Sequence, residues 1–262
     1  MHVTPSDLRL LRQDGAVVRF AVLESMAFVL AEIPPTGSGG TALEAPCTRP
    51  HWGFVVAGEV TVEVEGERQR IFAGSAFHLP SSGPAHRFIV PGAARIAGFE
   101  PIDPFTDTSD AGLAARGYEL MAPEHVGAAT VVPAAIEPLA DTNRIDVRPW
   151  AMSGLVLTQA RFGPGSGYTA EWCDAAHWGL VTAGRLAIEW EDDIEILTAG
   201  DVYHCPGGPP GHRLEAADPA SIVDLTPTEA FAGGRIAAWR RRPVEAVEPA
   251  APGVPIAVAG LG

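Results

Sequence analysis

Histidine and cysteine side chains recur in this chain at one fixed spacing. Four of them in the first half reappear 126 residues later: Cys47 as Cys173, His51 as His177, His78 as His204 and His86 as His212. Imidazole nitrogen and thiolate sulfur are ligands of divalent transition metals. The repeated set therefore predicts a metal site or another functional pocket in each half. The alternative is a set of neutral, hydrogen-bonded core histidines kept for packing.

The residue types also favour some metals over others. A set with thiolate sulfur favours zinc over magnesium or calcium, and iron, nickel and copper are alternatives on imidazole ligands. We expect His51, His86 and their counterparts to be ligands more than His78 and His204, which are also suited to lining a barrel. Cys47 and Cys173 fit a ligand or a small buried hydrophobe equally well. No catalytic residue is assigned.

Strands are predicted to carry these side chains. Val60, Val62 and Val64 alternate with polar residues, which is the period of a half-buried strand, and the second copy repeats the alternation. Glu63 and Glu189 fall on the solvent face in both copies, so we interpret them as exposed strand residues and not as acid catalysts. The residues that follow predict a turn and then the strand that carries the second histidine.

Composition and repeat length point to two β-rich domains. The 262 residues include 29 Gly and 24 Pro, a load typical of short strands joined by tight turns. From position 51 onward, 15 of 38 aligned positions are identical between the copies, which indicates a duplicated domain. We predict an N-terminal domain over 1–105, a linker over 106–146, a C-terminal domain over 147–228, and a helix and tail over 229–262. Short helices are expected near 110–120 and from residue 228 onward.

Charge and cysteine usage limit the partners and the location. The net charge is −14, from 18 basic and 32 acidic residues, which argues against a nucleic-acid or anionic membrane partner. The start of the sequence has no basic and then apolar signal pattern. Three cysteines without such a signal favour reduced thiols and a cytoplasmic location. A small-molecule ligand and a second copy of the chain remain open as partners.

The repeated residues resemble the two motifs of the cupin superfamily, and in duplicated form the bicupins. In the first motif, a metal-binding acid precedes a glycine by seven residues; His51 precedes Gly58 by seven. The second motif, a glycine, five residues, a proline and then a histidine, is matched by Gly74, Pro80 and His86, with one extra residue before the histidine. The second copy has Gly200-Asp201 and is closer to the family pattern.

This resemblance implies two double-stranded β-helix (jelly-roll) domains in an all-β chain. Cupin enzymes such as dioxygenases, oxalate decarboxylases and ureidoglycine aminohydrolases hold iron, manganese, nickel or zinc with three histidines and an acid. Here His51 and His177 stand at the position of the acid. The family motif also has two histidines, separated by one residue, before the acid. Cys47 and Cys173 stand at the second of these positions, and Ala45 and Glu171 stand at the first.

Three functional hypotheses follow. The leading one is a metal-binding bicupin that acts as an enzyme on a small organic metabolite, through a Lewis acid or activated water or dioxygen. The second is a non-catalytic module that senses a metal or a small molecule. The third is a structural bicupin with empty sites.

Overall fold

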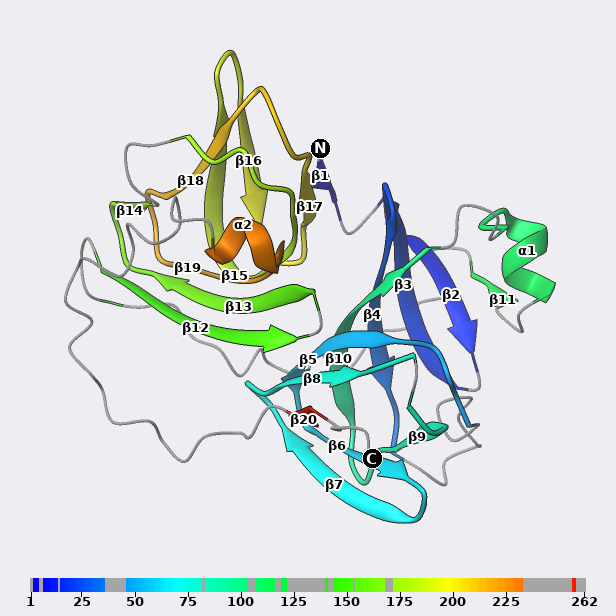
Figure 1. The fold of residues 1–262 in the computed structure, drawn as a ribbon. Helices are drawn as coiled ribbons and strands as arrows, with labels where there is room; N and C mark the ends of the chain where they lie inside the picture. The colour runs from blue at the N-terminus through cyan, green and yellow to red at the C-terminus, as the bar shows by residue number, and fades with distance from the viewer. Residues whose placement is uncertain are drawn as a thin grey trace. The chain divides into compact units, whose positions relative to one another are not determined.

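The computed structural model consists mainly of β-strands (Figure 1). It describes residues 2–4, 7–13, 15–35, 46–81, 83–102, 107–115, 119–121, 140, 144–152, 154–167, 172–232 and 256–257. The chain divides into two compact units, Asp7–Ala135 with Gly253–Gly262, and Met1–Ser6 with Ile136–Pro252. Most of the predicted linker and tail, together with Ala45 and Glu171, lies outside the described residues.

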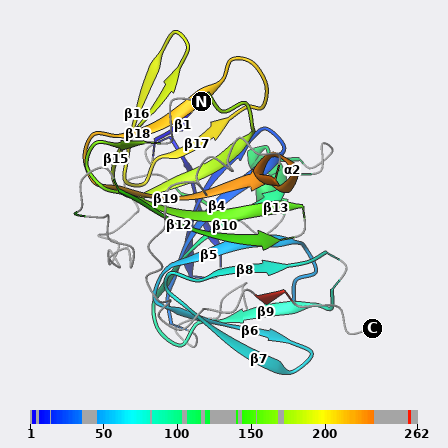
Figure 2. The ribbon, with the colours of Figure 1, turned by 60° about the vertical axis from the view of Figure 1, so that its left-hand side comes forward.

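The N-terminal unit contains an eight-stranded and a three-stranded sheet. The larger sheet runs in the order β11 (Glu119–Leu120), β2 (Arg9–Gln13), β3 (Ala16–Leu23), β4 (Met26–Ile33), β10 (Ala94–Pro101), β5 (His51–Ala57), β8 (Ala76–Leu79) and β20 (Ile256–Ala257). The smaller sheet has the order β7 (Glu67–Phe72), β6 (Glu59–Val64) and β9 (His86–Ile89). Figure 2 shows β6 and β7 as a hairpin.

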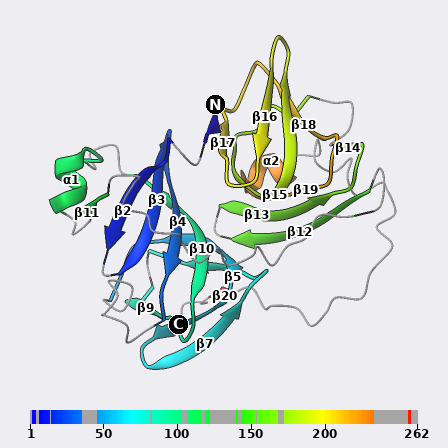
Figure 3. The ribbon, with the colours of Figure 1, turned by 180° about the vertical axis from the view of Figure 1, so that it is seen from behind.

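The C-terminal unit has one strand that takes part in two sets of pairings. Its sheet runs β1 (His2–Val3), β17 (Val202–Cys205), β15 (His177–Trp190), β19 (Ala220–Pro227), β13 (Leu155–Phe162) and β12 (Ile145–Met152). The far half of β15 also pairs with β16 (Ile194–Thr198) and β18 (His212–Ala216), and β18 pairs with β14 (Ser166–Gly167). Figure 3 shows the long β15–β16 hairpin.

Both ends of the chain add a strand to the unit formed mainly by the other half. β1 pairs antiparallel with β17, with His2 opposite Tyr203 (Figure 1). β20 pairs parallel with β8, with Ile256 opposite Phe77. Each of these strands therefore lies beside the strand that carries the middle histidine of its unit.

Each unit has its own apolar core. In the N-terminal unit, Val55 and Phe77 from the larger sheet pack with Phe88 from the smaller one. In the C-terminal unit, Val181 and Tyr203 belong to the corresponding cluster. A core enclosed by strands in each half confirms the predicted all-β, two-domain jelly-roll class.

The helices are short. α1 spans Asp110–Ala115, within the segment where a helix was expected, and α2 spans Thr228–Ala232. Among the described residues, no helix has the length and apolarity needed to cross a membrane.

A glycine at the end of β5 should be important for stability. Gly58 has a φ of +79°, and a Cβ there would lie 2.3 Å from the carbonyl oxygen of Ala93. Gly66 has a φ of +86°, but a Cβ there would meet nothing within 4 Å. Gly66→Ala should therefore cost about 1 kcal/mol of unfolding free energy from its backbone conformation. Gly58→Ala should cost about 1 to 3 kcal/mol more because of the clash.

Denaturant unfolding of the two variants measures this difference. Equal stability losses in the two variants would show that the close approach of Ala93 does not constrain the chain.

Candidate metal centres

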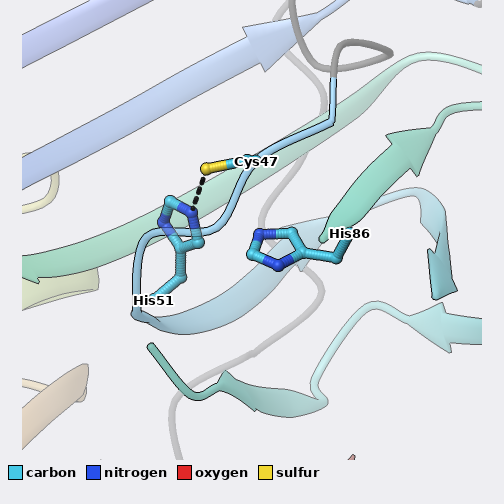
Figure 4. Close-up of side chains that lie close together, drawn as sticks. All are labelled: Cys47, His51 and His86. Atoms are coloured by element: carbon cyan, nitrogen blue, oxygen red, sulfur yellow. Dashed lines mark hydrogen bonds between the residues drawn. The ribbon is translucent and has the colours of Figure 1, made fainter. Parts of the chain in front are cut away.

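The first centre consists of three side chains from separate parts of the N-terminal unit. Cys47 lies in the segment before β5, His51 is the first residue of β5, and His86 is the first residue of β9. One ligand atom from each lies within 4.8 Å of the others, and Figure 4 shows the three side chains pointing toward one another. Cys47 Sγ lies 3.3 Å from His51 Nε2, and the two histidine rings are almost perpendicular, with centroids 5.1 Å apart.

Backbone hydrogen bonds explain how these residues meet. The amide of Cys47 donates to the carbonyl of His86 at 2.7 Å, and the amide of His86 donates back to Cys47 at 2.9 Å. This reciprocal pair ties the segment before β5 to the start of β9. The cysteine and the second histidine are therefore neighbours although they are far apart in sequence.

The second centre repeats this geometry in the C-terminal unit. Cys173, His177 and His212 also have ligand atoms within 4.8 Å of one another. Cys173 Sγ lies 3.2 Å from His177 Nε2, and the rings of His177 and His212 are 5.0 Å apart at 86°. Reciprocal backbone bonds of 2.8 and 2.9 Å join Cys173 and His212.

The residues of both centres fit a metal ion. A sulfur and a nitrogen about 3.3 Å apart can both lie at bonding distance from one ion, about 2.3 Å for sulfur and about 2.0 Å for nitrogen. His86 Nε2 and His212 Nδ1 are buried and have no hydrogen-bond partner among the described residues. A buried polar atom normally has a partner. Each centre therefore contains a buried imidazole nitrogen that no hydrogen bond from a described residue occupies, although it is Nε2 in one histidine and Nδ1 in the other.

The structure adds a carboxylate to each centre that the sequence reasoning missed. Glu100 Oε1 lies 2.7 Å from His51 Nδ1, and Asp224 Oδ1 lies 2.9 Å from His177 Nδ1. Each acid is therefore on the ring nitrogen opposite the cysteine, where it fixes the ring orientation and directs Nε2 toward the ligand cluster. The available signal was a single acid in a mainly apolar strand, β10 or β19. The two acids are 124 residues apart, so the 126-residue repeat did not reveal them.

His78 and His204 are not brought into these clusters. His78 lies opposite Trp52 across β5 and β8, and their rings stack with centroids 5.0 Å apart. His204 stacks on Trp178 in the same way at 5.3 Å. Successive strand residues point to opposite faces, so a side chain that pairs with Trp52 faces away from His51. The clusters thus contain three of the four repeated side chains.

Charge separation is expected in the first centre when it holds no metal. Burial alone would raise the pKa of the Cys47 thiol, but hydrogen bonds with His51 and His86 lower this pKa to about 5. Burial would lower the pKa of His51, but Cys47 and Glu100 raise this pKa to about 9. At neutral pH, the pair is therefore a thiolate beside an imidazolium that also contacts Glu100.

In the second centre, the pKa values of the cysteine and of the neighbouring histidine are shifted in the same directions as in the first. Burial opposes the charge on His177, but Asp224 and Cys173 raise the pKa of His177 to about 10. Burial and the neighbouring His177 lower the pKa of His212 to about 3, which keeps its ring neutral. A neutral imidazole is the form that binds metal. The third cysteine, Cys205, is fully buried, and burial raises the pKa of its thiol well above the usual value.

Alkylation of the metal-free protein tests the thiolate. Because the pKa of Cys47 is about 5, its reaction with iodoacetamide should remain fast down to about pH 6, whereas an ordinary thiol slows about tenfold per pH unit below its pKa. His51→Gln should move the dependence toward that of an ordinary thiol, because it removes one of the groups that lower the pKa of Cys47. Cys205 serves as the buried control. Peptide mass mapping reports each site. A rate at Cys47 that falls steadily from pH 8 to pH 6 would contradict the ion pair.

Comparisons with known proteins identify the fold. No protein-family model and no curated protein sequence matches the chain. Among solved structures, a mutant of the oxalate decarboxylase of Bacillus subtilis matches with a TM-score of 0.58 and 14% identity, over 87% of this chain and 77% of that one. A second mutant of this enzyme matches with a TM-score of 0.59 and 13% identity, over 87% of this chain and 77% of that one.

A third structure, from work on the Mn(II) centres of that B. subtilis enzyme, gives a TM-score of 0.58 at 15% identity over 87% of this chain and 77% of that one. Identities at this level establish the fold and not the reaction. The jelly-roll units, the repeated histidine positions and these structural matches together show that the chain has the two-domain cupin fold of the bicupins.

Proposed function

We propose that the protein is a metal-binding bicupin in which each unit holds one divalent transition metal ion. Cys47, His51 and His86 would bind the first ion. Cys173, His177 and His212 would bind the second. The observation that carries this proposal is the meeting, in both units, of one sulfur and two imidazoles within 4.8 Å, with one buried nitrogen left without a hydrogen bond.

Zinc is the metal that this donor set favours. A thiolate with two imidazoles is a soft and borderline set that suits zinc, whereas carboxylate and water ligands suit manganese. In each centre, the carboxylate contacts a ring nitrogen and leaves the metal ligands to sulfur and nitrogen. Iron, nickel, manganese and copper are the alternatives. Reduced thiols are required in every case, in keeping with the predicted cytoplasmic location.

The same centres would support chemistry on a small organic metabolite. Three protein ligands leave a coordination position open, and a bound metal would supply Lewis acidity or an activated water there. The chain contributes the orientation of the ligand rings, through Glu100 and Asp224, and the partial exclusion of water. Cys47 and His51 are partly exposed, whereas His86 is buried, so the open position would lie on the side of Cys47 and His51. A non-catalytic sensor would use the same ligands without turnover.

A cysteine nucleophile is the second candidate, and one observation favours it. The sulfur of Cys47 contacts one ring nitrogen of His51, and the carboxylate of Glu100 contacts the other. This is the order of a nucleophile, a base and the group that orients the base. However, this reading leaves the unpaired Nε2 of His86 without a partner among the described residues. Metal protection of Cys47 from alkylation would decide against the nucleophile.

Metal content tests the proposal directly. Protein purified without a histidine tag and loaded with zinc should retain two ions per chain by elemental analysis. His86→Ala and His212→Ala should each remove one ion, because each deletes a ligand of one centre. His78→Ala is the matched control, since this histidine stacks on Trp52 outside the clusters. A content below a few tenths of an ion per chain would overturn the metal site.

A further inference from the structure

The acids of the two centres occupy different positions on equivalent strands. Gly98 on β10 lies opposite Gly53, and Asp224 on β19 lies opposite Gly179, the counterpart of Gly53. The counterpart of Asp224 is therefore Gly98. By the same register, the counterpart of Glu100 is Thr226. The carboxylate of the second centre therefore stands two residues earlier along the equivalent strand than that of the first centre, on the same face.

In the second centre, a tyrosine holds the acid. Tyr203 lies opposite Gly179, and a Cβ on Gly179 would lie 2.1 Å from the ring, so the tyrosine passes across the glycine to reach β19. Its hydroxyl donates to Asp224 Oδ2 at 2.7 Å. Thr226 donates its hydroxyl to Asp224 Oδ1 at 2.9 Å and lies 2.9 Å from His177 Nδ1.

In the first centre, the residues equivalent to Asp224 and Tyr203 are Gly98 and Phe77, neither of which has a polar side chain. Phe77 passes across Gly53 in the same way, because a Cβ on Gly53 would lie 2.1 Å from its ring. Its ring has no hydroxyl to donate to a side chain on the neighbouring strand. The longer side chain of Glu100 reaches His51 from the neighbouring position. Its other oxygen lies 3.2 Å from the guanidinium of Arg49, whose side chain is 53% exposed.

We propose that Glu100 and Asp224 are positioning residues with one shared task, and that the Tyr203 and Thr226 contacts make the second centre the tighter metal site. This inference rests on the proposed function. Each carboxylate holds the Nδ1 side of its histidine and thereby keeps Nε2 directed at the metal. Asp224 is buried and fixed by two hydroxyls, whereas the charge of Glu100 is partly neutralised by an exposed arginine. Partners of this kind change metal affinity by about 10- to 100-fold.

The experiment transfers the first arrangement into the second centre of the full-length chain. With His86→Ala removing the first centre, Asp224→Gly should weaken zinc binding by about 10- to 100-fold in a competitive titration. Adding Thr226→Glu and Tyr203→Phe recreates the positions of Glu100 and Phe77. That triple change should recover part of the lost affinity but not reach the wild-type level of the second centre. The first centre, measured in a His212→Ala background, should also bind zinc more weakly than the wild-type second centre.

Two outcomes of the titration would overturn the proposal. One is unchanged zinc affinity in Asp224→Gly, and the other is a folded triple variant without any recovery. If Asp224→Gly unfolds the domain, Asp224→Leu keeps a similar side-chain volume and removes both acceptor oxygens, and it should show the same loss of affinity.

A readout without metal separates this inference from the metal proposal. If the His86→Ala protein binds no zinc at all, the proposed function fails, but the positioning role is still measured by nitrogen-15 NMR of the imidazole rings. The His177 Nδ1–H signal should be protected and shifted downfield by the carboxylate. It should move upfield and exchange faster in Asp224→Gly, where the Thr226 hydroxyl is the acceptor that remains, and should return toward its original position in the triple variant. An Nδ1–H signal indifferent to all three changes would contradict the positioning role.

Discussion

Two reciprocal backbone hydrogen bonds in each unit hold the candidate centre together. They join Cys47 to His86 and Cys173 to His212, with lengths between 2.7 and 2.9 Å. Without them, the cysteine would lie in an irregular segment with no fixed distance to the second histidine. With them, sulfur and imidazole ligands meet beside the first residue of β5 or β15, which supplies the third side chain. Because main-chain atoms make these bonds, this part of the arrangement tolerates different side chains around it.

The strand register then decides which other residues can take part. One face of β5 carries His51 toward the cluster, and the opposite face carries Trp52 toward His78. The same division separates His177 from Trp178 in the second unit. A shift of one residue would exchange these faces, so the pairing with the neighbouring strands is as important for the centre as the ligands themselves.

Much of this could be predicted from the sequence, for identifiable reasons. The alternation of Val60, Val62 and Val64 and the glycine-rich turns predicted strands, and the fixed offset predicted equivalent histidines in both halves. Cross-strand pairing was not readable, so His78 was grouped with residues from which the sheet separates it. The acids were missed because Glu100 and Asp224 do not obey the common offset. Their role depends on a cross-strand distance that only the folded register supplies.

The two centres therefore share ligands and differ in what surrounds those ligands. Repeated sequence preserved the cysteine and the two histidines, whereas the carboxylate moved by two strand positions, with Tyr203 in one unit and Phe77 in the other. A moved acid that still contacts the same ring nitrogen indicates that the contact itself is what matters. Under the proposal made above, such a difference would give one chain two centres of unequal metal affinity.

X-ray absorption spectroscopy of the zinc-loaded protein measures the ligand set most directly. The account predicts one sulfur at about 2.3 Å and two imidazole nitrogens at about 2.0 Å around each ion, with a lighter atom in the remaining position. A spectrum with only nitrogen and oxygen neighbours would contradict it, because the cysteine would then lie beside the metal without binding it.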